Sequence, residues 1–156
     1  MVSITHSKLP LIRRACHADL PVLIELLHWL ALDEPHMTLP HIQAVWDNIS
    51  ASSIMSVWIV EHGGVAVGTY TLAILPTLCH VGTPTALVES VVVAPEQRGQ
   101  QLGELMMRHA CDQAAAAGCY KLALSSNRRR LDAHRFYRRL GFQEHGISFA
   151  IDPTHV

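Results

Sequence analysis

Apolar and polar residues follow each other along the first half of the chain with two different periods. A short apolar stretch at 9–14 predicts a strand, and the stripe that follows Asp19 has the spacing of a helix. That stripe consists of Val22, Leu23, Leu26, Leu27 and Leu30. A second helix is expected at 39–50 because its apolar residues recur in the same way. The β-branched runs 56–61 and 65–75, separated by His-Gly-Gly, predict a hairpin.

The second half of the chain alternates strands and helices. The pattern predicts a strand at 86–93, a helix at 102–117, a strand at 120–126, a helix at 132–140 and a last strand at 147–151. A hairpin followed by this alternation is typical of a partly parallel sheet with helices on its faces. No repeat or linker interrupts it, so we expect one mixed α/β (α+β) domain over the whole chain, 1–156.

The composition fits a compact protein rather than a disordered chain. Apolar residues make up 49% of the 156 residues and charged residues 16%. No apolar run approaches the roughly 20 residues of a membrane-spanning helix, and the first residues lack the pattern of a secretion signal. We therefore expect a cytoplasmic protein that does not bind membranes. The four cysteines form no CxxC pair and the eleven histidines no HExxH pair, so no metal is expected.

Charge is distributed unevenly although the net charge is only −1. No Lys or Arg occurs between residues 15 and 97, whereas this segment contains Asp19, Glu25, Asp33, Glu34, Asp47, Glu61, Glu89 and Glu96. One interpretation is ordinary surface solubility. The other is a molecule with an acidic end for a cationic substrate and a basic end for an anionic cofactor. Both interpretations remain open at this stage.

The sequence Glu-Gln-Arg-Gly-Gln-Gln-Leu-Gly at 96–103 lies between a predicted strand and a predicted helix. A helix N-terminus presents free N–H groups and partial positive charge, so an anion can dock there. Gly99 and Gly103 would let the backbone approach a pyrophosphate, and Arg98 adds a fixed positive charge. Turns of this kind are common, so this turn alone does not establish a phosphate site.

Two motifs together resemble the GNAT superfamily of acyl-CoA N-acyltransferases. The first is Arg-Gly-Gln-Gln-Leu-Gly at 98–103, which follows the family's cofactor turn, Arg/Gln-x-x-Gly-x-Gly/Ala, except at the central glycine. The second is Tyr-Arg-Arg-Leu-Gly-Phe at 137–142, which matches Tyr-x-x-x-Gly-Phe about 34 residues later. The resemblance extends over most of the chain. It looks closest to bacterial members that act on small amines, such as glucosamine-6-phosphate and aminoalkylphosphonate N-acetyltransferases.

The resemblance implies a mixed, partly parallel sheet of about six to seven strands with helices on both faces. It also implies acetyl-CoA as co-substrate, with the pantetheine arm beside the strand at Val91, Val92 and Val93. The phosphates would lie on the turn and the helix start, at Arg98, Gly99, Gln100, Gln101, Leu102, Gly103 and Glu104. Asn127 would contact the cofactor arm. Many relatives pair through sheet edges or last strands, which favours a homodimer.

Gln101 stands where the family has its central glycine. A left-handed conformation there would cost a non-glycine residue roughly 1–2 kcal/mol. We therefore expect Gln101 to be near-helical. Its side chain would narrow the approach to the pyrophosphate and lower the affinity without changing the binding mode.

Glu89 is the candidate general base. It lies in a strand that is otherwise Ala, Leu, Val and Ser, where a buried carboxylate is costly unless it has a task or a partner. Burial would make such a carboxylate a stronger base, suited to removing a proton from an ammonium. The alternative is a carboxylate paired with an arginine or with buried backbone. Strand alternation places Ser90 on the opposite face.

Tyr137 is the candidate general acid, because its phenol could protonate the leaving thiolate of coenzyme A. The alternative is an aromatic ring that packs with Phe136 and Phe142. His134 lies one helical turn earlier and is a second candidate acid or base, although a histidine at such a position is more often a surface residue.

The acceptor end is expected from the first two helices and the hairpin. Asp33, Glu34, Trp46 and Asp47 fall there, and carboxylates beside an aromatic face suit an ammonium. Trp46 could also belong to the core, and the acids could simply be solvated. The lack of Lys and Arg in this region weighs against a phosphorylated sugar or a phosphonate as substrate.

A nucleic-acid partner is not expected despite the basic run Arg128-Arg129-Arg130. The acidic middle of the chain leaves no extended basic face, and no stacking aromatics are interleaved with the arginines. Contact with the 3′-phosphate of the cofactor, or simple solvation, explains the run better.

These features predict an N-acetyltransferase that moves an acetyl group from acetyl-CoA to a primary amine of a small molecule. No cysteine sits where a covalent nucleophile would be expected, so the attack would be direct, within a ternary complex. A protein acetyltransferase acting on lysine or an N-terminus is one alternative. A non-catalytic acyl-CoA-binding sensor is another, although Glu89 and Tyr137 argue against it.

Overall fold

The computed structural model describes residues 9–32 and 34–155 of the chain. Its backbone forms two compact units, one that ends at Ala123 and one that begins at Leu124. Among the described residues, no helix is long and apolar enough to cross a membrane.

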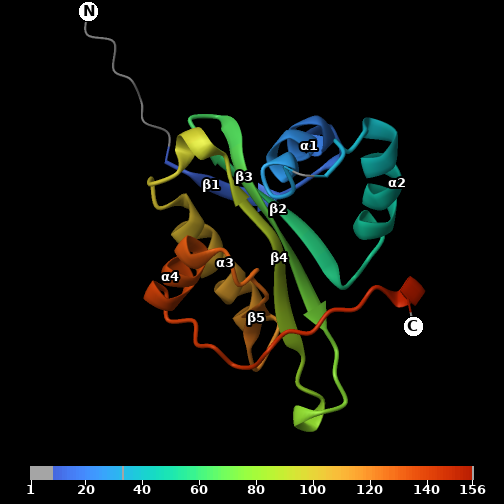
Figure 1. The fold of residues 1–156 in the computed structure, drawn as a ribbon, viewed down its shortest axis with the longest axis vertical. Helices are drawn as coiled ribbons and strands as arrows, with labels where there is room; N and C mark the ends of the chain where they lie inside the picture. Colours follow the sequence, from blue (N-terminus) through green and yellow to red (C-terminus); the bar gives the residue numbers. More distant parts are fainter. Residues whose placement is uncertain (1–8, 33, 156) are drawn as a thin grey trace, which may run out of the picture. The chain divides into compact units, whose positions relative to one another are not determined.

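The first unit is built on one mixed sheet of five strands, of which the last ends with Leu124, the first residue of the second unit (Figure 1). The strands lie in the order in which they occur along the chain: β1 (Leu11–Arg14), β2 (Met55–His62), β3 (Val65–Leu75), β4 (Thr85–Val93) and β5 (Leu122–Leu124). The first three pairings are antiparallel. On the last side, Tyr120 N donates to Pro84 O and Ala86 N donates to Lys121 O. Residue numbers rise together across this pairing, so β4 and β5 run parallel.

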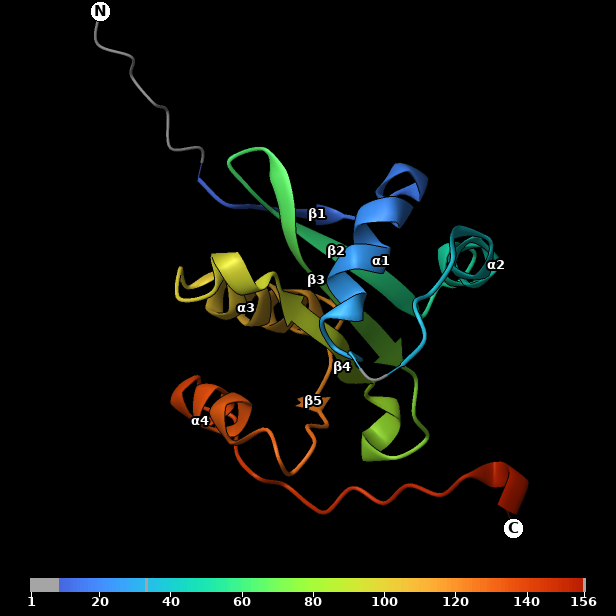
Figure 2. The ribbon, with the colours of Figure 1, turned by 45° about the horizontal axis from the view of Figure 1, so that its top comes forward.

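Helices cover both faces of this sheet (Figure 2). Helices α1 (Leu20–His28) and α2 (Leu39–Ser50) pack on one face, where Ile59 is fully buried in a cluster with Leu20, Leu23 and Ile42. Helix α3 (Leu102–Ala116) packs on the other face, where the Trp58 ring centroid lies 4.4 Å from that of His109. Trp58 and Ile59 are neighbours in β2, so strand alternation assigns them to the two cores.

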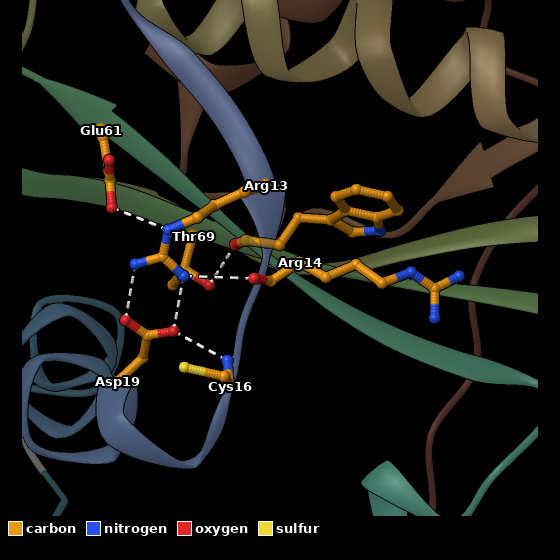
Figure 3. A network of polar contacts seen from close by, with 7 residues as sticks. Arg13, Arg14, Cys16, Asp19, Glu61 and Thr69 are labelled. Carbon is orange, nitrogen blue, oxygen red and sulfur yellow. Dashed lines mark hydrogen bonds and ion pairs between the residues drawn. The ribbon is translucent and has the colours of Figure 1, made fainter.

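A polar network fixes the start of α1 against the sheet (Figure 3). The Arg13 guanidinium donates to both carboxylate oxygens of Asp19, at 2.7 and 2.8 Å, and its Nε donates to Glu61 of β2 at 2.7 Å. Cys16 N also donates to Asp19. The helix begins after Asp19 as the sequence predicts, but the Asp19 side chain makes no cap bond to α1 because Arg13 and Cys16 occupy it.

The second unit contains helix α4 (Leu131–Arg139). Short 3₁₀ turns lie at His17–Asp19, His80–Gly82, Pro95–Gln97 and Pro153–His155.

The prediction of a strand at 147–151 is wrong, and the described residues form five strands rather than six to seven. Ile147, Phe149 and Ile151 keep the alternating pattern but are 82%, 88% and 73% exposed. No described strand pairs with this segment, and a strand requires such a partner.

The remaining predicted elements agree with the structure within a few residues. The hairpin at 56–61 and 65–75 is confirmed as β2 and β3, and the strand at 86–93 as β4. The predicted strand 120–126 is shortened to three residues in β5.

Candidate functional site

A register shift in the middle of β4 creates the first feature of the site. Thr69 of β3 pairs with Val92, whereas Thr71 pairs with Glu89. Three steps along β4 thus match two steps along β3, so β4 carries one extra residue, a β-bulge. Ser90 adopts a positive φ of 55° there, a conformation that non-glycine residues rarely take. Ser90 and Val91 together face Tyr70.

A pocket of about 240 Å³ opens beside this bulge, on the α1 and α2 face of the sheet. Helices α1 and α2 and strands β2, β3 and β4 all contribute to its wall. The lining residues are Leu20, Leu23, Leu27, Met37, Ile42, Val45, Trp46, Ile49, Met55, Val57, Thr69, Thr71, Glu89 and Ser90. The polar ones lie at the β3–β4 pairing, and the apolar ones lie on the two helices, on β2 and, for Met37, on the segment that joins the helices.

The bulge corrects two expectations about β4. Glu89 and Ser90 both line the pocket, although plain alternation predicted opposite faces. The cause is the positive φ of Ser90, which breaks the alternation between these two residues. Glu89 is also exposed and not buried, because the pocket is open beside it. Burial therefore does not explain this carboxylate, and its position in the pocket wall does.

The predicted acceptor residues are only partly assembled by the structure. Trp46 lines the pocket and also packs against the core cluster beneath it. Glu34 and Asp47 are exposed and are not among the lining residues. Asp33 lies outside the described residues. The carboxylate that lines this pocket together with Trp46 is Glu89.

Sequence reasoning missed Thr69 and Thr71, the two hydroxyl side chains that β3 presents to the pocket. Their alternate spacing in an apolar strand was the available signal. Thr69 is buried, and its hydroxyl donates to Trp58 O at 2.8 Å. Its hydrogen is therefore already engaged, and its lone pairs remain available as acceptors.

The turn from β4 to α3 leaves a helix N-terminus uncapped. The first hydrogen bond of α3 joins Leu105 N to Gln101 O at 3.0 Å. The N–H groups of Leu102, Gly103 and Glu104 precede it and have no intrahelical acceptor. No side chain caps this end either. The turn thus presents a row of N–H donors at the positive end of the α3 dipole.

Gln101 is left-handed, with a φ of 61°, and the expectation that it is near-helical is wrong. It occupies the N-cap position, where the backbone must turn from Gly99 and Gln100 into the helix. Gly99 also has a positive φ, of 78°, so the turn needs two left-handed positions and has glycine at only one. The structure therefore holds Gln101 at a cost of roughly 1–2 kcal/mol.

The other polar side chains of the turn are tied locally. Arg98 Nε donates to Val93 O at 3.3 Å, and Gln100 donates to Gln97 at 3.0 Å. Glu104 forms an ion pair with Arg108 at 2.7 Å, which offsets its negative charge near the free N–H groups. Val92 and Val93 pair with Thr69 and Gly68 of β3.

Tyr137 belongs to the second unit and packs in a small aromatic cluster. Its ring centroid lies 5.1 Å from that of Phe136 and 5.6 Å from that of Phe142. Burial raises the pKa of the Tyr137 phenol, and the Arg130 charge opposes this shift. The phenol is therefore protonated at neutral pH, the state that a proton donor requires. His134 is partly buried on the same helix.

The side chains of Asn127, Arg135 and Arg138 in the second unit have local partners. Asn127 Oδ1 accepts from Arg129 N at 2.9 Å, which shapes the turn before α4. Arg135 pairs with Asp132 and Arg138 with Glu144. Among the described residues, no group of three His, Cys, Asp or Glu side chains could hold a metal ion.

The family model described as "Acetyltransferase (GNAT) family" matches residues 23–142, well over half of the chain. The chain belongs to this family, a class of acetyl-CoA-dependent N-acyltransferases. It is 32% identical over 102 residues to the glucosamine 6-phosphate N-acetyltransferase of Trypanosoma brucei brucei, covering 65% of this chain and 67% of that protein. It is 39% identical over 62 residues to the aminoalkylphosphonate N-acetyltransferase of Salmonella typhimurium, covering 40% of each.

Solved structures share this fold across nearly their whole length. A protein of Agrobacterium tumefaciens str. C58 assigned as an acetyltransferase is 33% identical, with a TM-score of 0.86 over 91% of this chain and 99% of its own. An acetyltransferase fold from Clostridium acetobutylicum, solved with acetyl-CoA, has a TM-score of 0.75 at 17% identity over 95% and 99% of the two chains. At that identity the second likeness concerns the fold alone.

Proposed function

We propose that this enzyme transfers the acetyl group of acetyl-CoA to the primary amine of a small molecule by direct attack in a ternary complex. The observation that carries the proposal is the continuity of β4. One strand carries Glu89 in the pocket wall, the bulge at Ser90 and Val91, and then the turn into the uncapped start of α3. An acceptor pocket and an anion site thus lie on a single short segment.

The residues of this segment fit the pyrophosphate of acetyl-CoA. The N–H groups of Leu102, Gly103 and Glu104 are free of intrahelical bonds, and Arg98 adds positive charge. The bulge leaves the backbone at Val91 outside the regular ladder, so its amide is a candidate to bind the pantetheine arm or the thioester oxygen. When bound, acetyl-CoA supplies the activated acetyl group. Asn127 remains a further candidate for the cofactor arm.

Glu89 is proposed as the general base. An ammonium has no lone pair, so it must lose a proton before nitrogen can attack the thioester carbonyl carbon. Glu89 takes this proton, directly or through water in the open pocket. The new C–N bond then forms as the C–S bond breaks, and the sulfur leaves as a thiolate. The nitrogen loses a second proton to water and becomes the neutral amide. Because the reaction is bimolecular, holding both reactants side by side supplies much of the rate.

Tyr137 is proposed as the general acid that protonates the departing thiolate. The support is the Tyr-x-x-x-Gly-Phe motif at 137–142 and the burial that keeps the phenol protonated. The proton passes from the phenol oxygen to the sulfur, and the phenolate is reprotonated from solvent. His134 is a second candidate for this proton transfer.

The test is a coenzyme A release assay on a panel of primary amines, with Glu89→Gln and Tyr137→Phe beside the parent protein. Each variant should lower kcat by roughly 100-fold or more while acetyl-CoA binding stays intact by calorimetry. Glu25→Gln and Tyr120→Phe are matched controls, because both residues are exposed and neither lines the pocket. A parent protein that fails to bind acetyl-CoA would refute the proposal, and full activity in both variants would refute the two roles.

A homodimer in the cytoplasm completes the proposal and rests on the resemblance to relatives. Sedimentation of the protein in solution tests the assembly.

The size of the pocket, about 240 Å³, supports a small-molecule acceptor over a folded protein surface.

A further inference from the structure

The walls of the acceptor pocket have a consistent chemistry that narrows the substrate. Resting on the function proposed above, we infer that the acceptor is an apolar monoamine. Such a molecule has one ammonium group on an aliphatic or aromatic body and carries no phosphate, phosphonate or second charge. The matched relatives named for glucosamine 6-phosphate and aminoalkylphosphonate act on anionic amines, so this inference separates the chain from them.

Most of the pocket wall is apolar. Ten of its fourteen lining residues carry hydrocarbon, thioether or indole side chains, and they come from α1, α2, β2 and the segment that joins the two helices. Met37 and Val45 are partly exposed on this wall, so a ligand there would cover apolar surface that now meets water. Burial of that surface favours a ligand whose body is itself apolar.

Among the described residues (9–32 and 34–155), no cationic side chain lines the pocket to receive an anionic substituent. Its lining residues all fall between Leu20 and Ser90, inside the segment from 15 to 97 that has neither Lys nor Arg. The segment does contain histidines, but none of them lines the pocket. A phosphate or phosphonate inside it would lose its hydration without gaining a charged partner, which is strongly unfavourable.

The polar groups of the pocket suit an ammonium at one end. Within the part of the chain that the structure describes, Glu89 is the one charged lining residue, and Thr71 stands directly opposite it in the β3–β4 ladder. Thr69 has given its hydrogen to Trp58 O, so it offers lone pairs to a ligand N–H. These acceptors gather at the β4 bulge, and the apolar wall extends away from them. An amine would therefore place its nitrogen at Glu89 and its hydrocarbon body along α2.

The decisive experiment compares primary amines whose bodies differ in polarity and charge. Hexylamine and 2-phenylethylamine represent the inferred class, and glucosamine 6-phosphate and aminomethylphosphonate represent the anionic class. The kcat/KM should be at least about tenfold higher for the first pair. Among linear amines it should rise about fourfold for each added CH₂ until the pocket is full. An anionic amine that is used equally well or better would overturn the inference and leave the acetyltransferase intact.

Ligand binding measured without turnover tests the inferred pocket chemistry separately from the proposed acetyltransferase activity. If no amine is acetylated, the proposed function fails, and thermal stabilisation of the protein by hexylamine, hexanol and hexanoate decides the pocket chemistry. Stabilisation by hexylamine well above that by hexanol, and none by hexanoate, supports the inference. Equal stabilisation by hexanoate, or no stabilisation by hexylamine, contradicts it.

A charge placed in the wall gives an independent check. Val45 lines the pocket and is 49% exposed, so Val45→Lys should fold. It should lower kcat/KM for hexylamine about tenfold and improve the relative use of glucosamine 6-phosphate. Gln43→Lys is the matched control, since Gln43 is exposed on the same helix and does not line the pocket. Identical effects of both substitutions would count against an apolar acceptor site at Val45.

Discussion

Glu89 and Ser90 are consecutive residues of β4, yet both line the same pocket. In a regular strand they would face opposite sides of the sheet. The positive φ of Ser90 and the extra residue opposite Tyr70 remove this alternation. The bulge thereby adds the Ser90 hydroxyl to the pocket wall next to the proposed base, and it leaves the backbone of Val91 outside the β3–β4 ladder. The strain at Ser90 and the candidate chemistry of the site are two aspects of one feature.

The strain at Ser90 predicts opposite effects for two substitutions. Ser90→Gly should raise the free energy of unfolding by up to about 1 kcal/mol, because glycine adopts a φ of 55° without penalty. Ser90→Val should lower it by roughly 1–2 kcal/mol, since a β-branched residue resists this conformation. Urea unfolding measures both. Ser53→Gly is the control: Ser53 is exposed with no positive φ, and glycine there should destabilise slightly. Stabilisation by Ser90→Val would contradict a left-handed bulge.

A substitution at Gln101 should raise both the stability of the protein and its affinity for acetyl-CoA. Gln101→Gly removes a left-handed cost of roughly 1–2 kcal/mol and adds a smaller entropic cost, so stability should rise by about 0.5–1 kcal/mol. It also removes a side chain next to the free N–H groups of α3, so acetyl-CoA should bind several times more tightly by calorimetry. Gln100→Gly, at a position without positive φ, should not stabilise. Weaker acetyl-CoA binding by Gln101→Gly would show that the Gln101 side chain contacts the cofactor.

The elements of the fold could be predicted wherever the signal is local. The hairpin β2–β3 and the helices α1 to α3 each carry their own periodicity, and the structure reproduces them. The strand expected at 147–151 has the same kind of pattern but fails. Alternation specifies which residues share a face, whereas a strand also needs a neighbour, and pairing depends on residues far away in the sequence.

Some of the residues that line the candidate pocket could be predicted from the sequence, whereas the geometry of the pocket could not. Glu89 was identified as an unusual carboxylate, and Trp46 as a candidate pocket residue. The bulge was not predictable, because serine has no local preference for a positive φ that would announce it. Glu34 and Asp47 are predicted from their charge and from their position near the first two helices, and neither property determines which way a residue of a surface helix or loop points.

The lowered pKa of the Asp19 carboxyl predicts how the free energy of unfolding depends on pH. The Arg13 hydrogen bonds lower the pKa of the Asp19 carboxyl from 3.8 to about 2, with a further contribution from Cys16 N. Because the pKa is lower in the folded state, this group contributes its full stability, about 2 kcal/mol, above pH 4 and loses it as the pH falls towards 2. Asp19→Asn should therefore destabilise the protein by about that amount at pH 7, and the difference from the parent should shrink below pH 4.

Urea unfolding between pH 2.5 and 7 checks this prediction. Glu61→Gln removes the other carboxylate of the network, which makes a single contact to Arg13 and is more exposed than Asp19. It should cost clearly less than Asp19→Asn at pH 7. A pH-independent difference between Asp19→Asn and the parent would show that the lost stability comes from packing and not from the ion pair.

Gly68 connects the packing of β3 and β4 to the site. A Cβ at this position would lie 2.9 Å from Val92 O, a backbone atom that cannot move without displacing β4 beside the bulge. Gly68→Ala should therefore lower the free energy of unfolding by roughly 1–3 kcal/mol. It should also lower kcat/KM, because β4 carries Glu89 and leads into the turn that is proposed to bind acetyl-CoA. Gly146→Ala, where an added Cβ meets nothing within 4 Å, should change stability by less than about 0.5 kcal/mol. If Gly68→Ala is as stable and active as the parent, β4 is free to shift, and the alignment of the pocket with the cofactor turn does not depend on this contact.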